Sequence, residues 1–417
     1  MRKVLAIYGT RPEAIKMAPV VREIERSPHL DVRVAVTGQH RELLDQVNSL
    51  FGIRPAHDLD IIRPRQSLEE ITVNALAGLG EVIRAEAPDM VATQGDTTTS
   101  MVAALAAFYQ RVPVVHVEAG LRTSNSYSPY PEEINRRLTA QLASLHLAPT
   151  PGARANLIAE NIAPETIVTT GNTVIDALVD VAERDVPFTD PRLRRLQGRR
   201  IVLVTAHRRE SWGRPMERSA RALARLATMF PDVYFVLPTH PNPVVREALL
   251  PVLAPLPNVV IIDPLPYDQF ARIMGLSTVV LTDSGGVQEE APSLGKPVLV
   301  LRDTTERPEG IEAGTVRLVG TDEDRIVEEV GLLLTDKAEY QAMATAVNPY
   351  GDGQAARRSV RAIEHFFGIG ERPDEFQPYL RGPATRGTSA TRFRSHGTHD
   401  LTCVRCEVLA EVDQTSA

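Results

Sequence analysis

Short apolar runs alternate with helical patterns along the first part of the chain. KVLAIY and DMVAT have the length of buried strands, whereas EEINRRLTAQLA spaces its apolar residues as a helix does. Strands are predicted at 3–8, 31–36, 89–93 and 112–117, and helices at 14–26, 40–50, 68–87, 97–109 and 132–143. This alternation predicts a parallel sheet with helices on both faces.

The same alternation begins again near residue 200. Strands are predicted at 200–205, 233–237, 258–262, 278–282, 297–301 and 315–319, and helices at 215–229, 243–253, 266–275, 286–294, 322–347 and 355–367. The fold class is therefore α/β, with two doubly wound parallel-sheet domains. Segment 184–200 is rich in Arg and Pro and predicts an exposed loop, and a hinge is expected near 169–177.

The composition changes after about residue 380. Segment 381–417 is rich in Gly, Ser, Thr and Arg and has no apolar periodicity, which predicts a mostly disordered tail. His396, His399, Cys403 and Cys406 are zinc-ligand types, but their spacings are shorter than those of common zinc modules. We therefore expect no metal site.

Charge and cysteine content exclude several classes of protein. A chain of 417 residues has room for two or three domains, and its net charge of −7 argues against a nucleic-acid or anionic-membrane binder. No cysteine precedes Cys403, so no disulfide framework is expected. The short apolar run at the start resembles no signal segment, and no run is long enough to span a membrane. We expect a cytoplasmic protein.

Charged residues recur after the predicted strands. In open parallel sheets, ligands bind beyond the carboxyl ends of the strands. Candidates at these positions are Arg11, Lys16, Asp96, Glu118, His207, Arg208 and His240, with Glu132 at a helix start. Each residue alone could be a helix cap or a solvated charge. Their joint occurrence in both series predicts a site in a cleft between the domains.

The segment DSGGVQEE suggests what such a site holds. Ser284, Gly285 and Gly286 connect a strand to a helix, and glycines let backbone N–H groups approach an anion closely. Glu290, one turn further, could accept hydrogen bonds from a ribose diol. The turn therefore predicts a nucleotide pyrophosphate site. The chain has neither a G-x-G-x-x-G after the first strand nor a P-loop, so we expect no nicotinamide cofactor.

Several long motifs resemble one family. GTRPEAIKMAP, GDTTTS, HVEAGLRT, YSPYPEEINRR, TAHRRES, LTDSGGVQEEAPSLGKPVLVLRDTTERPEG and NPYGDGQAARR stand in the order found in the non-hydrolysing bacterial UDP-N-acetylglucosamine 2-epimerases. The resemblance covers residues 2 to about 370. It implies a homodimer of chains with two Rossmann-like domains in the GT-B arrangement. The first would be 1–170, completed by a helix at about 355–370, and the second, nucleotide-binding domain would be 171–354.

The resemblance also implies a reaction and its residues. UDP would be expelled from the sugar, C2 would lose a proton to give a 2-acetamidoglucal, and UDP would add back after C2 is reprotonated on the other face. Asp96, Glu118 and Glu132 match the family's catalytic acids. Arg11, Lys16, His207 and the turn at 284–286 would hold the departing UDP, with Phe270 and Arg307 near the uracil. No cofactor or metal is implied.

Other implications and alternatives stay open at this point. The resemblance suggests a second, activating UDP-N-acetylglucosamine bound by Gln46, Arg65, Arg208 and His240. It does not say which carboxylate is acid and which is base. A hydrolysing epimerase that releases the free sugar shares many motifs, and the SGGVQEE turn alone would suit a GT-B glycosyltransferase. A nucleotide-sugar sensor without turnover is a further alternative.

Overall fold

A computed structural model describes residues 1–38, 41–61, 63, 66–123, 125–127, 129–184, 186–208, 211–305 and 307–378. The predicted tail at 381–417 and the predicted activator contact Arg65 lie outside these ranges. Within them, no helix combines the length and apolar character needed to cross a lipid bilayer.

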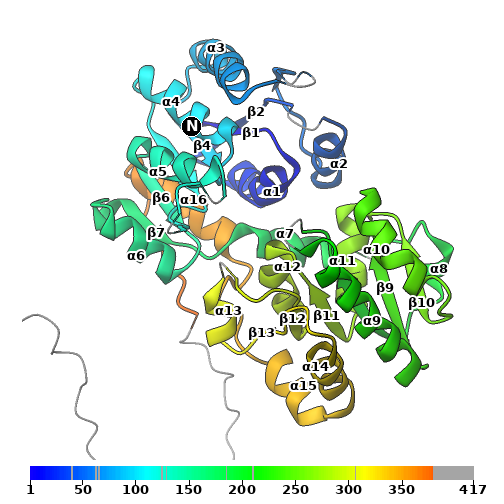
Figure 1. Ribbon diagram of the computed structural model, residues 1–417. Coiled ribbons are helices and arrows are strands. Elements are labelled where there is room, and N and C mark those ends of the chain that lie inside the picture. Colours follow the sequence, from blue (N-terminus) through cyan, green and yellow to red (C-terminus); the bar gives the residue numbers. More distant parts are fainter. Residues whose placement is uncertain are drawn as a thin grey trace, which may run out of the picture. The chain divides into compact units, whose positions relative to one another are not determined.

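Seven parallel strands form the first sheet, in the order β3-β2-β1-β4-β5-β6-β7 (Figure 1). The strands are β1 (Arg2–Tyr8), β2 (Leu30–Val36), β3 (His57–Asp58), β4 (Met90–Gln94), β5 (Val114–Val117), β6 (Leu145–Ala148) and β7 (Ile167–Thr169). Alternate residues of β1 point to opposite faces. Val4, Ala6 and Tyr8 join one apolar cluster, whereas Leu5 and Ile7 join another.

Helices cover both faces of this sheet. They are α1 (Arg11–Arg26), α2 (Arg41–Phe51), α3 (Leu68–Glu86), α4 (Thr98–Tyr109), α5 (Glu132–Leu142), α6 (Pro151–Ala159), α7 (Thr173–Ala182) and α16 (Ala355–Phe366). Late in the sequence, α16 packs against α1 and α7, as the orange helix in Figure 1 shows. Asp176 of α7 accepts hydrogen bonds from the backbone N–H groups of Ala355 and Ala356 and so caps α16.

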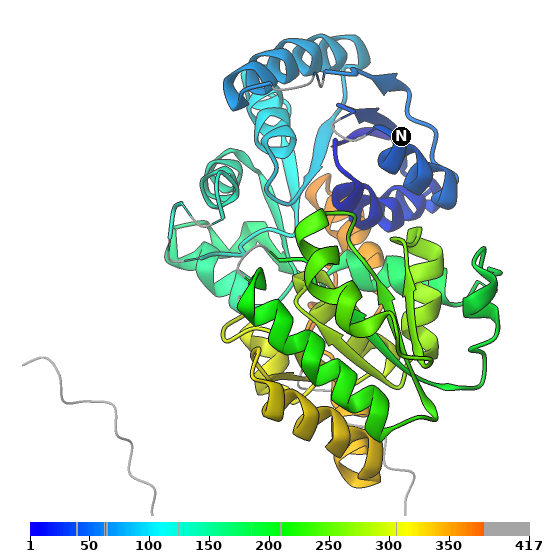
Figure 2. The same cartoon turned by 45° about the vertical axis from the view of Figure 1, so that its right-hand side comes forward.

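Six parallel strands form the second sheet, in the order β10-β9-β8-β11-β12-β13. The strands are β8 (Arg200–Thr205), β9 (Val233–Pro238), β10 (Val259–Ile262), β11 (Val279–Thr282), β12 (Val298–Val300) and β13 (Val316–Leu318). Its main helices are α9 (Arg214–Met229), α10 (Pro243–Leu253), α11 (Tyr267–Leu276), α12 (Gly285–Glu290), α13 (Pro308–Glu312), α14 (Glu323–Thr335) and α15 (Lys337–Ala344). Figure 2 shows α9 in green beside α14 in gold.

Two predicted segments need correction. Segment 184–200 is not simply an exposed loop, because it contains the short helix α8 (Pro191–Arg194) and buries Phe188, Leu193 and Leu196 in the apolar cluster of the second sheet. The predicted helix 322–347 is two helices, because the Asp336 side chain accepts from the N–H groups of Ala338 and Glu339 and starts α15 there.

The stretch from 143 to 183 contains elements that the sequence pattern missed. The strands β6 and β7 have four and three residues, too few to show a period. Helix α7 occupies most of the segment predicted as a hinge, with Asn172 as its N-cap. The domain boundary at 170 stays a prediction.

Gly120, in the loop after β5, has no room for a side chain. Its φ is +91°, and a Cβ atom there would overlap the carbonyl oxygen of Ala153. We expect Gly120→Ala to lower the free energy of unfolding by about 2–4 kcal/mol, from left-handed strain plus the clash. Gly198→Ala is the matched control, because Gly198 has φ +77° and open space around it.

Gly198→Ala should lower the free energy of unfolding by only about 1 kcal/mol, because left-handed backbone strain is its only cost. Thermal or urea unfolding measures both variants. Equal losses in the two would mean that the backbone approach at Gly120 is unimportant.

Candidate active site

The turn after β1 is fixed by Glu13. Its carboxylate accepts hydrogen bonds from the N–H groups of Gly9 and Thr10, at 3.0 and 2.7 Å. Its other oxygen accepts from the Thr97 hydroxyl at 2.6 Å. Burial raises the pKa of Glu13, although these donors oppose the rise. One buried carboxyl thus ties the turn that carries Arg11 to the loop after β4.

Lys16 and Glu118 form a buried ion pair. Lys16 Nζ lies 2.5 Å from Glu118 Oε2, and Glu118 has the left-handed φ of +64°. Burial alone would lower the pKa of Lys16, but the charges of Glu118 and Glu289 raise it overall. Burial alone would raise the pKa of Glu118, but Lys16 and, more weakly, Arg307 and Arg136 lower it overall. Both groups are therefore held in their charged forms.

Arg307 lies across the predicted pyrophosphate turn. A Cβ atom at Gly285 would come within 2.8 Å of Arg307 Nη1, so any larger residue there would require the guanidinium to move. Arg307 Nε donates to Glu289 Oε1 at 2.6 Å, and Asn172 Nδ2 donates to Glu289 Oε2 at 3.0 Å. Ser284 is the N-cap residue of α12, without a side-chain capping bond. The turn thus presents glycine backbone next to an arginine.

Glu290 is buried beside Arg11 and Tyr267. Burial and the neighbouring charge of Glu289 raise the pKa of Glu290 to about 8, against the opposing effects of Lys16, Tyr267 and Arg11. The Tyr267 hydroxyl donates to Glu290 Oε2 at 3.5 Å. At neutral pH the Glu290 carboxyl therefore carries a proton in the folded chain, and it can donate as well as accept a hydrogen bond.

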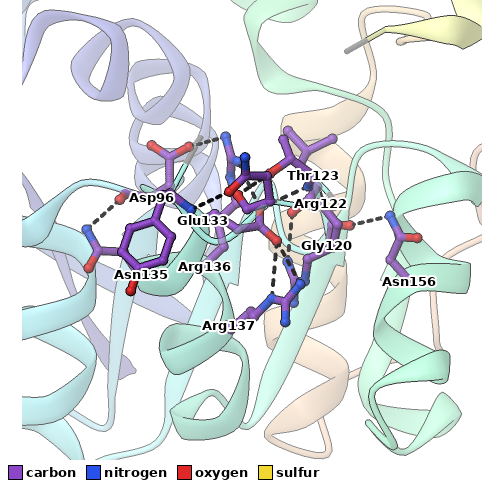
Figure 3. A network of polar contacts seen from close by, with 12 residues as sticks. Asp96, Gly120, Arg122, Thr123, Glu133, Asn135, Arg136, Arg137 and Asn156 are labelled. Carbon is purple, nitrogen blue, oxygen red and sulfur yellow. Dashed lines mark hydrogen bonds and ion pairs between the residues drawn. The ribbon is translucent and has the colours of Figure 1, made fainter. Parts of the chain in front are cut away.

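Asp96 is held by residues of α5, the helix that begins at Glu132. Arg136 Nη2 forms an ion pair with Asp96 Oδ2, and Asn135 Nδ2 donates to the Asp96 backbone carbonyl at 2.9 Å (Figure 3). Glu132 Oε2 is buried and has no hydrogen-bond partner among the described residues. Burying a carboxylate oxygen without a hydrogen-bond partner lowers the stability of the fold. Such unsatisfied groups are often found where the side chain has a function.

His207 is oriented by Asp283. His207 Nδ1 lies 3.0 Å from Asp283 Oδ1, and the backbone N–H groups of His207 and Arg208 donate to Asp283 Oδ2 at 2.6 and 2.8 Å. Burial raises the pKa of Asp283, but His207 and these donors lower it overall. The His240 ring lies parallel to the His207 ring, with centroids 6.1 Å apart.

The structure joins most of the predicted site residues into three clusters. Lys16, Glu118, Arg307, Gly285, Glu290 and Arg11 form the first, Asp96 with Arg136 of α5, the helix that Glu132 starts, the second, and His207, Arg208 and His240 the third. Phe270 is half-buried against the apolar cluster of the second sheet. Gln46 is exposed on α2. Two surface hollows, of about 400 and 510 Å³, are lined by other residues.

Sequence reasoning missed four residues that organise these clusters: Glu13, Arg136, Asp283 and Glu289. Glu13 could have been found, because it follows Thr10 by three residues as in a capping box. Asp283 could also have been found, because it directly follows β11, where ligands bind in open parallel sheets. Nothing local distinguishes Arg136 from Arg137. Within the described ranges, no group of three or more His, Cys, Asp or Glu could hold a metal ion.

The raised pKa of Glu290 predicts a pH-dependent stability. Between about pH 4.5 and 8, the folded chain keeps a proton that an unfolded glutamic acid has lost, so stability falls as pH rises. Glu290→Gln imitates the protonated form and removes this loss. The melting temperature of the variant minus that of the parent protein should therefore increase from pH 5 to pH 8. A difference that does not change with pH would contradict this prediction.

Comparisons with known proteins give the family. The model of the UDP-N-acetylglucosamine 2-epimerase family matches residues 22–364. The UDP-N-acetylglucosamine 2-epimerase of Escherichia coli K12 is 53% identical over 376 residues, which cover 87% of this chain and 98% of that protein. The enzyme of that name from Bacillus subtilis is 52% identical over 375 residues, covering 90% and 98%.

A solved structure supports the same assignment. The UDP-GlcNAc 2-epimerase from Neisseria meningitidis, bound to UDP-GlcNAc, is 47% identical, with a TM-score of 0.79 over 87% of this chain and all of that one. The predicted fold, two parallel-sheet α/β domains of the GT-B type, is confirmed. From the motifs, the matched length and the shared fold, this chain belongs to the UDP-N-acetylglucosamine 2-epimerase family.

Proposed function

We propose that this protein is a non-hydrolysing UDP-N-acetylglucosamine 2-epimerase, which interconverts UDP-N-acetylglucosamine and UDP-N-acetylmannosamine. The observation that carries the proposal is the buried Lys16–Glu118 pair, whose charges also act on Glu289 and Arg307 beside the Gly285 turn. A carboxylate suited to proton transfer thus lies within electrostatic reach of the residues suited to a nucleotide diphosphate. The names of the similar enzymes and the UDP-GlcNAc in the Neisseria structure agree with this substrate.

The proposed reaction has two halves. In the first, the C1–O bond breaks and its electron pair leaves with UDP, while a carboxylate takes the proton from C2. The former C2–H electron pair becomes the C1–C2 double bond of a 2-acetamidoglucal. In the second, a carboxylic acid protonates C2 from the opposite face, and a UDP phosphate oxygen bonds to C1. Elimination and addition both leave the net oxidation state of the sugar unchanged, so no oxidant is needed.

The named residues divide these tasks in the proposal. Asp96, Glu118 and Glu132 move the C2 proton, because general acid–base groups are needed on both faces. Arg11, Lys16 and His207, with the turn at 284–286, stabilise the negative charge that develops on departing UDP. Phe270 and Arg307 would lie near the uracil. Glu290, protonated near neutral pH, would donate one hydrogen bond to the ribose diol and accept another.

An incubation with UDP-N-acetylglucosamine in deuterated water, followed by proton NMR, tests the proposal. We expect UDP-N-acetylmannosamine with deuterium at C2 and no lasting free sugar, because C2 is reprotonated from solvent-exchanged carboxyls before UDP leaves the site. Accumulation of free N-acetylmannosamine and UDP would instead identify a hydrolysing epimerase. No reaction at all would favour a glycosyltransferase awaiting an acceptor, or a sensor.

We also propose that an activating second UDP-N-acetylglucosamine binds near His207. Arg208 and His240 lie beside His207, and Gln46 and Arg65 complete the predicted contacts. The parallel His207 and His240 rings give a reason for coupling, because a ligand that moves one ring would disturb the other.

A homodimer is proposed through α3, α4 and α5. Helix α4 contacts both α3 and α5, and the three helices expose several large apolar side chains, which is unusual for a free surface: Val73, Phe108, Tyr109, Ile134 and Leu138. We expect light scattering to give twice the chain mass of 45.8 kDa, and Leu138→Asp to reduce it to one chain. Met229→Asp is the control, because Met229 is equally apolar and exposed but lies on α9. A dimer that survives Leu138→Asp would place the interface elsewhere.

A further inference from the structure

The start of α5 holds Asp96 at two points. Arg136 Nη2 forms an ion pair with the Asp96 side chain, while Asn135 Nδ2 donates to its backbone carbonyl at 2.9 Å. Figure 3 shows Arg136 between Asp96 and Glu133. Arg136 lies in α5, whereas Asp96 lies in the connection between β4 and α4, 40 residues earlier in the sequence. Helix α5 therefore fixes both the position of this loop and the direction of its carboxylate.

Arg136 also forms an ion pair with Glu133, on the same helix. The Glu133 side chain is fully buried, and its Oε2 lies 3.5 Å from Arg136 Nη1 and accepts from the Thr123 N–H at 2.9 Å. Its Oε1 accepts from Arg137 Nε at 3.2 Å. The guanidinium thus uses one nitrogen for Glu133 and the other for Asp96, which only arginine's rigid fork can do.

The two adjacent glutamates of α5 have opposite surroundings. Glu133 is saturated with donors and belongs to the framework, whereas Glu132 Oε2 is buried without a partner among the described residues. Arg136 forms ion pairs with Glu133 and Asp96, whereas the structure describes no contact between Arg136 and Glu132. The charge of Arg136 also lowers the pKa of Glu118, but less than Lys16 does.

We propose that Arg136 is a positioning residue that aims the Asp96 carboxylate at C2 of the sugar, with Glu133 as its anchor. This role rests on the proposed epimerisation, in which Asp96 serves proton transfer on one face only. Loss of Arg136 should therefore impair one face of C2 and leave the other face and the UDP site intact. A misplacement of about 1 Å at a catalytic group can cost roughly 100-fold in rate.

The test measures a ratio in deuterated water. Each epimer serves in turn as the starting sugar. Deuterium entering the recovered starting sugar reports proton exchange on one face of C2, formation of the other epimer reports transfer on both faces, and the ratio compares the two rates. Asp96→Asn shows with which starting sugar, and in which direction, this ratio moves when Asp96 fails. Arg136→Met should shift the ratio in the same direction, by about 10-fold or more, and lower kcat by about 100-fold with UDP affinity within about 3-fold. A fraction of misfolded enzyme lowers both rates equally and leaves the ratio unchanged.

Arg137→Met is the matched control. Arg137 also pairs with Glu133, but its side chain is 43% exposed, and Figure 3 draws no contact between it and Asp96. Its loss should leave the ratio and kcat within about 3-fold of the parent protein. Equal ratio shifts in the Arg136 and Arg137 variants would mean that Glu133 anchoring alone matters, and would overturn the proposal.

Arg136→Lys provides a second variant should Arg136→Met fail to fold. Lysine keeps a cation near Glu133, but one nitrogen cannot serve Glu133 and Asp96 in the same geometry. The ratio should again shift toward that of Asp96→Asn, and a ratio equal to that of the parent protein overturns the proposal. If the parent protein neither exchanges nor epimerises, the proposed function itself fails, and the role of Arg136 with it.

Discussion

The buried pair of Lys16 and Glu118 is the interaction on which the site depends. Each charge alone would be costly to bury, and at 2.5 Å each compensates the other. The pair joins the second turn of α1, the helix after β1, to the residue that directly follows β5 at the carboxyl edge of the first sheet. It also holds an ammonium and a carboxylate in charged form within electrostatic reach of α12 in the second sheet. The other charges of the site are arranged around it.

Glu289 extends this arrangement to the chain segments that join the two sheets. Its carboxylate binds Arg307 and Asn172, and its backbone carbonyl accepts from Asn348 Nδ2 at 3.1 Å. Tyr350 closes the network, because its hydroxyl donates to the Arg307 carbonyl at 3.1 Å while its own carbonyl accepts from the Asn172 N–H at 2.7 Å. The arginine beside the glycine turn is thus held at its side chain by Glu289 and at its backbone by Tyr350, and Asn172 contacts both of these residues.

The carboxylates near these cations are distinguished by their partners rather than by their type. Glu118 has an ammonium, Asp96 a guanidinium, and Glu132 an oxygen without a partner in the described part of the chain. Glu290 is held protonated near neutral pH by burial and by its neighbour Glu289. Four acids of similar intrinsic acidity therefore have four different surroundings, which is what a reaction with separate proton-transfer and binding steps requires.

The sequence by itself determined the fold class, the main strands and the family, because apolar periodicity and long motifs are local signals. It also placed the glycine turn and the charges after β1, β4, β5 and β8, since strand ends can be recognised in the sequence.

The sequence could not determine which side chains pair with one another. Arg136 and Arg137 are adjacent arginines on one helix, and only the packing of α5 against the loop after β4 sends one to Asp96 and leaves the other exposed. Likewise, Glu289 and Glu290 look equivalent in sequence. Tertiary structure gave the first an arginine partner, and it buried the second so that its pKa rises to about 8, because solvation and ion pairing depend on residues distant in the chain.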